Sequence, residues 1–385
     1  MNTKIETHQK QNIKNQYGWM EWAGAFGDLG ILLPFIVGFI GVTKLDPFGI
    51  LFSFGLSMVL VGLVFRTPMP VQPMKLIGGI AITQAAVVSP GMIWGAGFFT
   101  GLLWLVLSVT NSISHVAKLA TKPIICGIAL GLGLSFMGNG IKMMTNSWMI
   151  AIIALLITFF LLKSKRFPAM FALLLFGCVV AFIETPDLIQ QLSNIRFKLQ
   201  VPSINFVPFT LKELFSGALL MAIPQAPITL GNAVVAVSAE NNRLFPDRPT
   251  TEKKVAYSVG LVNLIAPFFG GAPMCHGVGG MAGHVRFGAK TGGAVVIMGS
   301  ILLTLAMFFS GSIDIILQVF PEAVLGVILF FAGLEVAAGA GKVGSERSDF
   351  YIMLITAGFG MWNMGAGFLA GVIMQFFLAK GWARV

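Results

Sequence analysis

Charged residues are scarce in this chain. Only 10% of its 385 residues are Asp, Glu, Lys or Arg, whereas 56% are hydrophobic and the mean hydropathy is +0.87. Soluble globular domains carry roughly 25% charged residues. The composition therefore excludes a soluble globular protein and predicts an integral membrane protein.

Cysteines and enzyme motifs are also lacking. Cys126, Cys178 and Cys275 are widely spaced, which excludes a disulfide framework and a cysteine-ligated metal site. The sequence contains no HExxH, GxSxG, paired CxxC or Walker A motif. We therefore expect no enzymatic activity, no cofactor and no metal, and the missing nucleotide-binding motif argues against ATP-driven transport by this chain alone.

What the chain does have is a series of apolar runs that can cross a hydrocarbon core of about 30 Å. The polar residues 1–16 carry no apolar core and form a tail, not a signal peptide. The runs predict an all-α polytopic membrane protein with 14 transmembrane segments, at residues 21–42, 48–65, 70–88, 92–113, 123–138, 147–162, 167–183, 213–238, 254–270, 274–284, 291–311, 321–340, 350–361 and 363–379.

The positions of the 25 Lys and Arg residues support this count and an orientation. With the N-terminus inside, most basic residues fall in cytoplasmic segments, as the positive-inside rule requires. The net charge of +10 then reflects topology, so we expect no nucleic-acid partner. The prediction is a multi-pass protein of the inner (plasma) membrane with both termini cytoplasmic. Few basic residues fall in outside loops: Lys44, Lys142, Arg196, Lys198 and Lys212.

The segments divide into two sets of seven at the longest hydrophilic connection, residues 184–213. Because seven is odd, the second set enters the membrane from the opposite side, as in the inverted repeats of secondary transporters. The third segment of each set supports this plan. One reads QPMKLIGGIAI (72–82) and the other APMCHGVGGMAG (272–283), so both place Pro-Met shortly before Gly-Gly.

Prolines precede the helical part of both segments. Since proline lacks an N–H and pushes the preceding residue toward extended geometry, each segment should be extended first and helical afterwards. The two half-helices should start near the midplane and point their N-termini at each other. Helix N-termini present unpaired N–H groups and partial positive charge, so the pattern predicts a buried anion site.

Lys75 is the one basic residue that belongs to neither membrane face. A cation at the bilayer centre costs about 2.5–3.5 kcal/mol on insertion scales, so a lysine without a partner is unfavourable there. We interpret Lys75 as an electrostatic contact to an anionic substrate. The alternatives are a lysine that snorkels to an interface or pairs with Asp28.

Other polar residues in apolar runs complete the candidate site. Asp28 and Glu335 could accept a coupling proton or order the site. Segment 8 reads IPQAPITLGNAVVAVS, and its polar residues could bind an oxyanion or only join helices. His276 could donate to an anion, titrate, or be a satisfied interior histidine. The substrate-binding candidates are Lys75, Gln72, Met74, Gln225, Thr229, Asn232, Met274, Cys275, His276 and Gly277.

Several stretches resemble one family. FGDLGILLPF, PMPVQPMKLIGGIAI, IPQAPITLGNAVVAVS, NLIAPFFGGAPMCHGVGGMAGHVRFGAKTG and FPEAVLGVILFFAGLE are similar to signature segments of the molybdate transporter family related to the sulfate permeases. The likeness covers residues 20–379, and the chain resembles a prokaryotic member without a STAS domain. Two positions depart from the family pattern: Gly78-Gly79 stands where alanines are usual, and His284-Val285 replaces Gln-Tyr.

The resemblance implies the seven-plus-seven fold of sulfate permeases and nucleobase transporters. It implies molybdate as substrate, with sulfate or tungstate as related oxyanions, H⁺ or Na⁺ as coupling ion, and a homodimer in the lipid bilayer. An anion channel, or an intramembrane enzyme using Asp28, Lys75 and His276, remains an alternative. The implied parts are a cytoplasmic tail (1–16), a core domain (17–117 and 213–311), a gate domain (118–184 and 312–385) and an extracytoplasmic linker (185–212).

Overall fold

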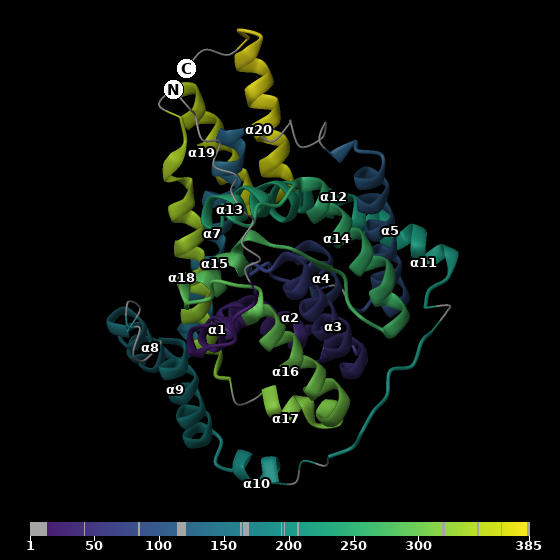
Figure 1. Cartoon of the computed structure of the whole chain (residues 1–385), viewed down its shortest axis with the longest axis vertical. Coiled ribbons are helices and arrows are strands. Elements are labelled where there is room, and N and C mark those ends of the chain that lie inside the picture. The colour runs from purple at the N-terminus through teal and green to yellow at the C-terminus, as the bar shows by residue number, and fades with distance from the viewer. Residues whose placement is uncertain are drawn as a thin grey trace, which may run out of the picture.

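The computed structural model is almost entirely helical (Figure 1). The only regular extended structure in its described part is one pair of two-residue strands. The described residues are 14–41, 43–83, 85–113, 121–161, 164, 169–193, 195, 197–205, 208–317, 320–344, 346–362 and 364–382.

The first half of the chain begins with a helix that contains a short 3₁₀ stretch. Every predicted segment of this half includes a helix. The elements are α1 (Trp19–Ala25), η1 (Phe26–Asp28), α2 (Leu29–Gly41), α3 (Pro47–Phe65), β1 (Gln72–Pro73), α4 (Lys75–Thr83), α5 (Pro90–Val109), α7 (Lys122–Met144), η2 (Thr145–Ser147), α8 (Trp148–Leu161), α9 (Ala169–Glu184) and α10 (Leu188–Ser193).

The second half also places a helix in every predicted segment. Two stretches of its first long helix, η3 and η4, are π-helical. The elements are α11 (Leu211–Gly217), η3 (Ala218–Ala222), α12 (Ile223–Ile228), η4 (Thr229–Ala236), α13 (Val237–Leu244), α14 (Glu252–Ile265), η5 (Ala266–Phe269), β2 (Met274–Cys275), α15 (Val278–Arg286), α16 (Gly293–Phe309), η6 (Ser310–Ser312), α17 (Ile313–Leu317), α18 (Glu322–Ala338), η7 (Gly339–Lys342), α19 (Arg347–Trp362) and α20 (Met364–Ala379).

Local sequence explains several helix starts. Asp46 caps α3 by accepting from the Gly49 N–H at 3.1 Å, with Pro47 at the first helical position. Ser89 caps α5 in the same way through the Met92 N–H at 3.2 Å. These caps fix where the helices enter their apolar runs, because they satisfy N–H groups that the helix itself leaves unpaired.

The start of α16 is capped from a distant part of the chain. The carboxylate of Glu21 on α1 accepts the backbone N–H groups of Lys290, Thr291 and Ala294 at 3.0, 2.9 and 3.1 Å. A buried carboxylate with three donors matches the positive end of the helix dipole. Glu21 therefore ties the first helix of one half to the second half.

Hydropathy and length together give a smaller count of spans than the sequence did. Among the described residues, four helical stretches are long and apolar enough to cross a membrane: Pro47–Phe65, Pro90–Val109, Lys122–Leu161 and Gly293–Ser312. A fifth arises if Trp19–Leu33 and Phe35–Gly41, bent by 46°, count as one span. The apolar helices Ala169–Glu184, Glu322–Phe331 and Ala366–Ala379 are shorter. The count of 14 therefore stays a prediction.

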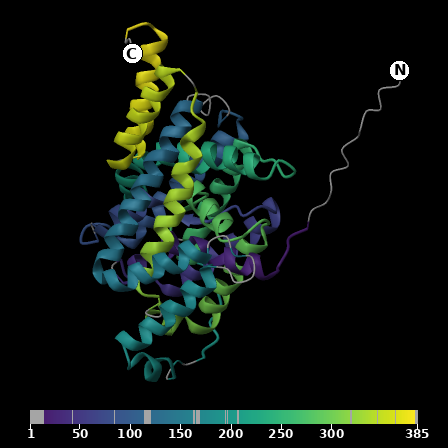
Figure 2. The ribbon, with the colours of Figure 1, turned by 90° about the vertical axis from the view of Figure 1, so that its left-hand side faces the viewer.

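The helices pack in two groups that each combine both halves of the chain. In one group α7 packs along α18 and α19, and α19 packs on α20. Figure 2 shows these helices running side by side along one edge of the molecule. In the other group α3 packs on α16, and α5 packs on α14 and α11. The site described below lies among helices of both groups.

Small residues allow the closest helix crossings. A Cβ added at Gly140 of α7 would lie 2.6 Å from the Gly326 carbonyl oxygen of α18, and one at Gly299 of α16 would lie 2.7 Å from the Gly55 carbonyl oxygen of α3. Such close backbone approach is typical of helix pairs within membranes, where van der Waals packing replaces the hydrophobic effect.

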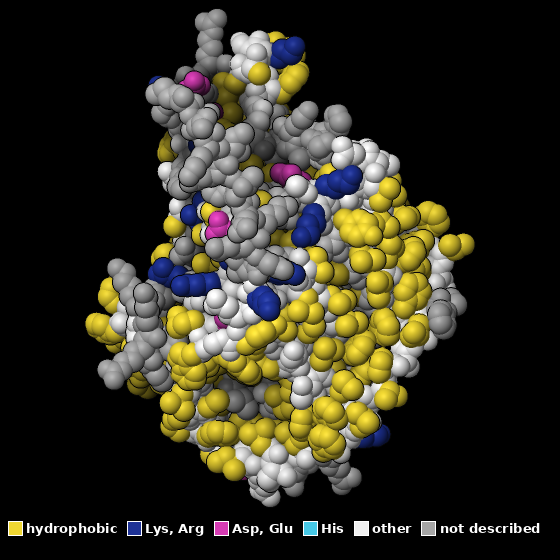
Figure 3. Space-filling view, in the orientation of Figure 1, with side chains coloured by type: hydrophobic (Ala, Val, Ile, Leu, Met, Phe, Trp, Pro, Cys, Tyr) yellow, Lys and Arg dark blue, Asp and Glu magenta, His cyan; other side chains and the backbone are white. Residues whose placement is uncertain are grey.

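The outer surface is strongly apolar. Hydrophobic side chains cover broad areas of the face in Figure 3, whereas most of the Lys and Arg side chains in view lie in a band across its middle. Met149, Phe160 and Trp362 are 76%, 74% and 82% exposed. Soluble monomers rarely expose apolar patches beyond a few hundred Å². With the apolar helices, this surface identifies a multi-pass membrane protein.

Candidate functional site

The two extended arms predicted from the proline patterns meet in the structure. Strands β1 and β2 pair antiparallel, with Gln72 opposite Cys275 and Pro73 opposite Met274. The Met74 N–H adds a bond of 2.9 Å to the Pro273 carbonyl oxygen. The pairing joins the two halves of the chain at the extended segments that precede α4 and α15.

A short helix begins directly after each arm. Helix α4 starts at Lys75, and α15 starts at Val278 with Gly277 as its N-cap residue. The arm residues Met74 and Met274 are fully buried, and Cys275 is nearly so. The sequence therefore located both helix starts correctly to within a few residues.

Asn263, on α14, holds the second arm in place. Its side-chain amide accepts from the Met274 N–H at 2.9 Å and donates to the Met274 carbonyl at 2.6 Å and the Val259 carbonyl at 2.8 Å. The sequence analysis quoted NLIAPFF but did not select this residue. The sequence did contain a signal for it, because an asparagine buried in an apolar helix needs hydrogen-bond partners.

Two amide side chains of one long helix reach the two half-helix starts. Gln225 accepts the Leu76 N–H of α4 at 3.0 Å, and Asn232 accepts the Val278 N–H of α15 at 3.3 Å. Gln225 also donates to the Thr229 hydroxyl at 3.1 Å. One N–H group at each half-helix start is therefore bonded, whereas the sequence analysis expected unpaired groups.

Thr229 and Asn232 lie in the π-helical stretch η4. A π-helix rotates the following side chains relative to an α-helix, and such stretches are frequent at functional sites. Gln225 and Asn232 are seven positions apart, about two helical turns, so they lie on nearly the same face of the helix and each can reach one half-helix start.

Asp28 lies between the first segment and the two arms. Its Oδ1 accepts from the Gln72 Nε2 at 2.5 Å, and its Oδ2 is buried without a hydrogen-bond partner in the described part of the chain. A Cβ added at Gly280 would lie 2.8 Å from that Oδ2. Asp28, the last residue of η1, is therefore packed tightly against β1 and α15.

Gly277 is required by a close approach of the two arms. A Cβ at this position would collide with the Gln72 Oε1, which itself is buried and has no partner among the described residues. The missing side chain at Gly277 therefore lets β1 and the start of α15 lie against each other.

Lys75, the first residue of α4, lines a cavity of about 600 Å³. The cavity also contacts α2, α7, η2 and α18, with Asn139, Lys142, Asn146 and Glu322 among its polar residues. The Lys75 Nζ is buried and has no hydrogen-bond partner within the described residues, where no ion pair joins it to Asp28 either. A buried ammonium without acceptors is unfavourable, so this site is suited to an anion.

Phe136 of α7 covers the ammonium group. Its ring centroid lies 4.6 Å from the Lys75 Nζ, and a Cβ added at Gly279 of α15 would collide with the same ring. The ring thus lies between the first turns of the two half-helices. Cation–π contact partly compensates a buried lysine but leaves its N–H donors unbonded. The sequence analysis missed this residue, because only packing brings α7 against both arms.

A second, smaller cavity of about 180 Å³ lies along the same helix α7. Val278 and Ala282 of α15 line it, together with Lys122, Glu240 and Arg243. Glu240 and Arg243 form an ion pair within α13. One half-helix therefore borders each cavity, and α7 borders both.

His276 faces away from both cavities. Its Nδ1 lies 2.7 Å from the Pro70 carbonyl oxygen and its Nε2 lies 2.9 Å from the Ser258 hydroxyl. Because a carbonyl only accepts, Nδ1 carries the proton and Nε2 accepts from Ser258. Both nitrogens are satisfied, which fits the interior-histidine alternative better than an anion contact.

Glu335 belongs to α18, but its side chain lies outside the described residues. Within the part that the structure describes, His, Cys, Asp and Glu form no group of three or more that could hold a metal ion. The structure thus brings together Asp28, Gln72, Lys75 and the arm residues, and places His276 behind them.

Solved structures share the fold of this chain. The chain has the fold of the transmembrane domain of a cyanobacterium bicarbonate transporter BicA, with a TM-score of 0.59 at 14% identity over 94% of this chain and 98% of that one. Murine Slc26a9, an anion transporter solved in the inward-facing state, gives a TM-score of 0.64 at 11% identity, covering 98% and 70%. The fold is that of these polytopic transporters.

Sequence comparison gives the family. A family model described as a molybdate transporter of the MFS superfamily matches residues 20–136 and 217–336. Molybdate transporter 2 of Arabidopsis thaliana is 31% identical, with 93% of this chain and 87% of that protein covered. The putative sulfate transporter YvdB of Bacillus subtilis is 23% identical over 56% and 46%. The chain belongs to the molybdate transporter family, which confirms the resemblance found in the sequence.

Proposed function

We propose that this chain is a secondary active transporter of a tetrahedral oxyanion, with molybdate as its first substrate. The observation that carries the proposal is the Lys75 ammonium, buried without a hydrogen-bond acceptor at the wall of a cavity of about 600 Å³. A dianion bound there would supply the missing acceptors and neutralise the charge. The names of the molybdate transporter relatives support the choice of substrate.

Binding uses the start of α4 as well as Lys75. An oxyanion at Lys75 lies next to the helix N-terminus, where N–H groups and the helix dipole favour negative charge. Gln225 holds the Leu76 N–H in the structure, so the anion takes over that donor when it binds. Neutral amide partners of this kind release an anion more readily than a second cation does.

The proposed transport step uses the two cavities that α7 borders, of which Phe136 lines the larger. We assign residues 17–117 and 213–311 to a core domain that slides against a gate domain of residues 118–184 and 312–385. The movement carries the two half-helices past α7 and exposes the anion first to one cavity and then to the other. In this proposal the chain crosses the inner (plasma) membrane fourteen times, with both termini cytoplasmic. It also forms a homodimer.

Asp28 is the proposed coupling residue. Its Oδ2 has no partner among the described residues, and its Oδ1 bonds to Gln72 of the first arm. A proton or a sodium ion at Oδ2 would change the charge beside the anion site, which links occupancy of the two sites.

Uptake into proteoliposomes tests the proposal. Saturable accumulation of isotope-labelled molybdate, with pH or sodium gradients applied in turn, is the expected result. Uptake that never exceeds electrochemical equilibrium would instead identify a channel. Absence of any flux would refute transport, and the acid-base residues would then deserve an assay for intramembrane catalysis.

Sulfate is the second candidate substrate, because one relative is named a putative sulfate transporter. Molybdate and sulfate are both tetrahedral dianions, so the same site can hold either. Competition by excess sulfate or tungstate in the uptake assay separates a selective site from a broad one.

A further inference from the structure

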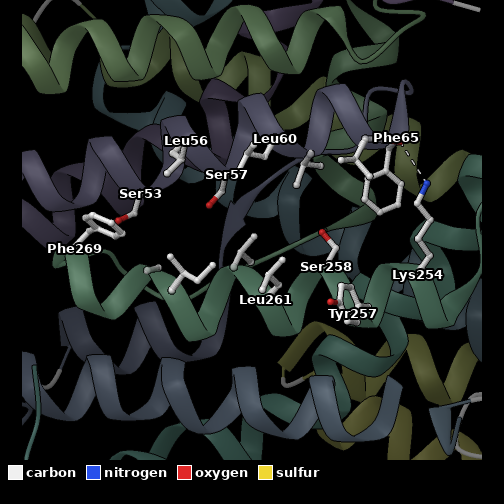
Figure 4. A pocket seen from close by; sticks show the side chains of 15 residues that line it. Ser53, Leu56, Ser57, Leu60, Phe65, Lys254, Tyr257, Ser258, Leu261 and Phe269 are labelled. Carbon is white, nitrogen blue, oxygen red and sulfur yellow. Dashed lines mark hydrogen bonds between the residues drawn. The ribbon is translucent and has the colours of Figure 1, made fainter. Parts of the chain in front are cut away.

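A third cavity lies away from Lys75, on a side of the molecule with exposed apolar side chains. It is a groove of about 290 Å³ between α3 and α14. Figure 4 shows Ser53 and Phe269 at one end and Phe65 and Lys254 at the other. Most of the lining is apolar, and the flanking Leu60 and Leu261 are 51% and 43% exposed. The groove is therefore open toward the hydrocarbon of the bilayer.

The length of the groove matches one membrane leaflet. The lining part of α3, from Ser53 to Phe65, rises about 18 Å at 1.5 Å per residue. One leaflet contributes roughly half of a hydrocarbon core of about 30 Å. A single acyl chain could therefore lie along the whole groove with its headgroup at the Lys254 end.

Positive charge is concentrated at that end. Lys254 lies above the Phe65 ring, 4.5 Å from its centroid, and its Nζ is 3.4 Å from the Val64 carbonyl oxygen. Arg248 donates to the carbonyl oxygens of Arg66 and Lys290 at 2.5 and 2.9 Å. No acidic residue is among the described residues that line the groove.

The back of the groove is connected to the substrate arms. Ser258 lines the groove, and its hydroxyl is the partner of the His276 Nε2. Phe65 contacts the His276 ring edge-on, with centroids 5.8 Å apart. An occupant of the groove thus touches the two residues that support His276, next to Cys275 and Gly277.

We propose that this groove binds one anionic phospholipid, with an acyl chain between α3 and α14 and the headgroup phosphate at Lys254. The shape selects a lipid chain, and the cations at one end select a negative headgroup. The inference requires only that the protein lies in a membrane and is independent of the transported substrate.

Native mass spectrometry of the delipidated, full-length protein tests it. Dioleoyl phosphatidylglycerol should be retained at one copy per chain, about fivefold more than dioleoyl phosphatidylcholine, as expected for one favourable cation contact. Lys254→Ala should remove this preference. Lys253→Ala is the matched control, because it removes the same charge from the adjacent exposed residue, which does not line the groove.

A groove-filling variant keeps the test independent of charge. Leu261→Trp should lower retention of both lipids while Lys254→Ala affects only the anionic one, and each variant's melting temperature in lipid-free detergent shows whether it is folded. Equal retention of the two lipids by the wild-type protein, or equal losses in Lys253→Ala and Lys254→Ala, would overturn the proposal. Dimers that dissociate in Leu261→Trp with lipid retention unchanged would assign the groove to a second copy and also overturn it.

Discussion

The two half-helix starts share a backbone plan but differ in chemistry. Each follows an extended arm, and an amide from the same long helix accepts one N–H of each, Gln225 at α4 and Asn232 at α15. Yet α4 begins with Lys75 beside a cavity of about 600 Å³, whereas α15 begins with Val278 and small residues packed against Gln72, Asp28 and Phe136. The start of α4 therefore provides a positive charge, and the start of α15 provides close packing.

This difference fits the proposal that the anion binds at only one of two similar elements, the start of α4. A second lysine at the α15 start would repel the first and raise the cost of burial. If α15 also began beside a cavity, the two extended arms would lose the close packing that holds them in place. The two arms therefore have different roles. We expect substitutions at the start of α4 to alter transport and those at the start of α15 to alter the stability of the fold.

The largest effect is expected from Lys75→Met, which removes the charge and keeps much of the side-chain volume. A hydrogen bond to a charged group contributes about 1.5–3 kcal/mol, so uptake at low molybdate should fall about 10- to 100-fold. Lys142→Met, at an exposed residue of the same cavity, should reduce uptake far less, because water screens its charge. Equal losses in the two variants would contradict the special role of the α4 start.

Asn263→Ala should have the next largest effect, on stability. It leaves the buried N–H and carbonyl of Met274 without their side-chain partner, at about 1–3 kcal/mol for each unsatisfied group. Asn263→Asp retains an acceptor for the N–H but directs a second oxygen at the carbonyls of Met274 and Val259 and buries an acid, so it should lose at least as much. Melting temperatures in detergent measure both, and a wild-type value for Asn263→Ala would show that the second arm does not depend on this clamp.

Gly277→Ala and Gly79→Ala compare the packing of the two arms directly. A Cβ at Gly277 collides with Gln72, so we expect a loss of about 1–3 kcal/mol, while a Cβ at Gly79 of α4 meets nothing within 4 Å. Gly79→Ala should be neutral or stabilising by up to about 1 kcal/mol, since alanine favours a helix. Thermal unfolding distinguishes the two, and the reverse order would invalidate the comparison.

The smallest effects are expected from the two amide caps. Gln225→Ala and Asn232→Ala each remove the acceptor of one helix-start N–H, which costs about 1 kcal/mol. If the anion binds at α4, Gln225→Ala should change the KM for molybdate, whereas Asn232→Ala should change only the melting temperature. Identical KM shifts in both variants would place the anion equally between the two helix starts.

Much of the site could be predicted because its signals are local. The prolines of PMPVQPM and APM determine where the chain cannot be helical, and Lys75 stands out because burial of an isolated cation is costly. Contacts between distant helices were not predictable in this way. Phe136 looks like any apolar residue of α7, and His276 looked equally suited to bind an anion and to be a satisfied interior histidine.

The sequence by itself determined that the chain is a helical membrane protein with two proline-broken segments and one lysine that belongs to neither membrane face, because hydropathy, proline geometry and the cost of buried charge act locally. Its signature segments carried the resemblance to the molybdate transporter family. Only the tertiary structure decided which groups face which. In the structure the Leu76 N–H donates to Gln225, His276 bonds to Ser258, and the Phe136 ring lies over Lys75. Those outcomes depend on the packing of helices from both halves, which no single stretch of sequence specifies.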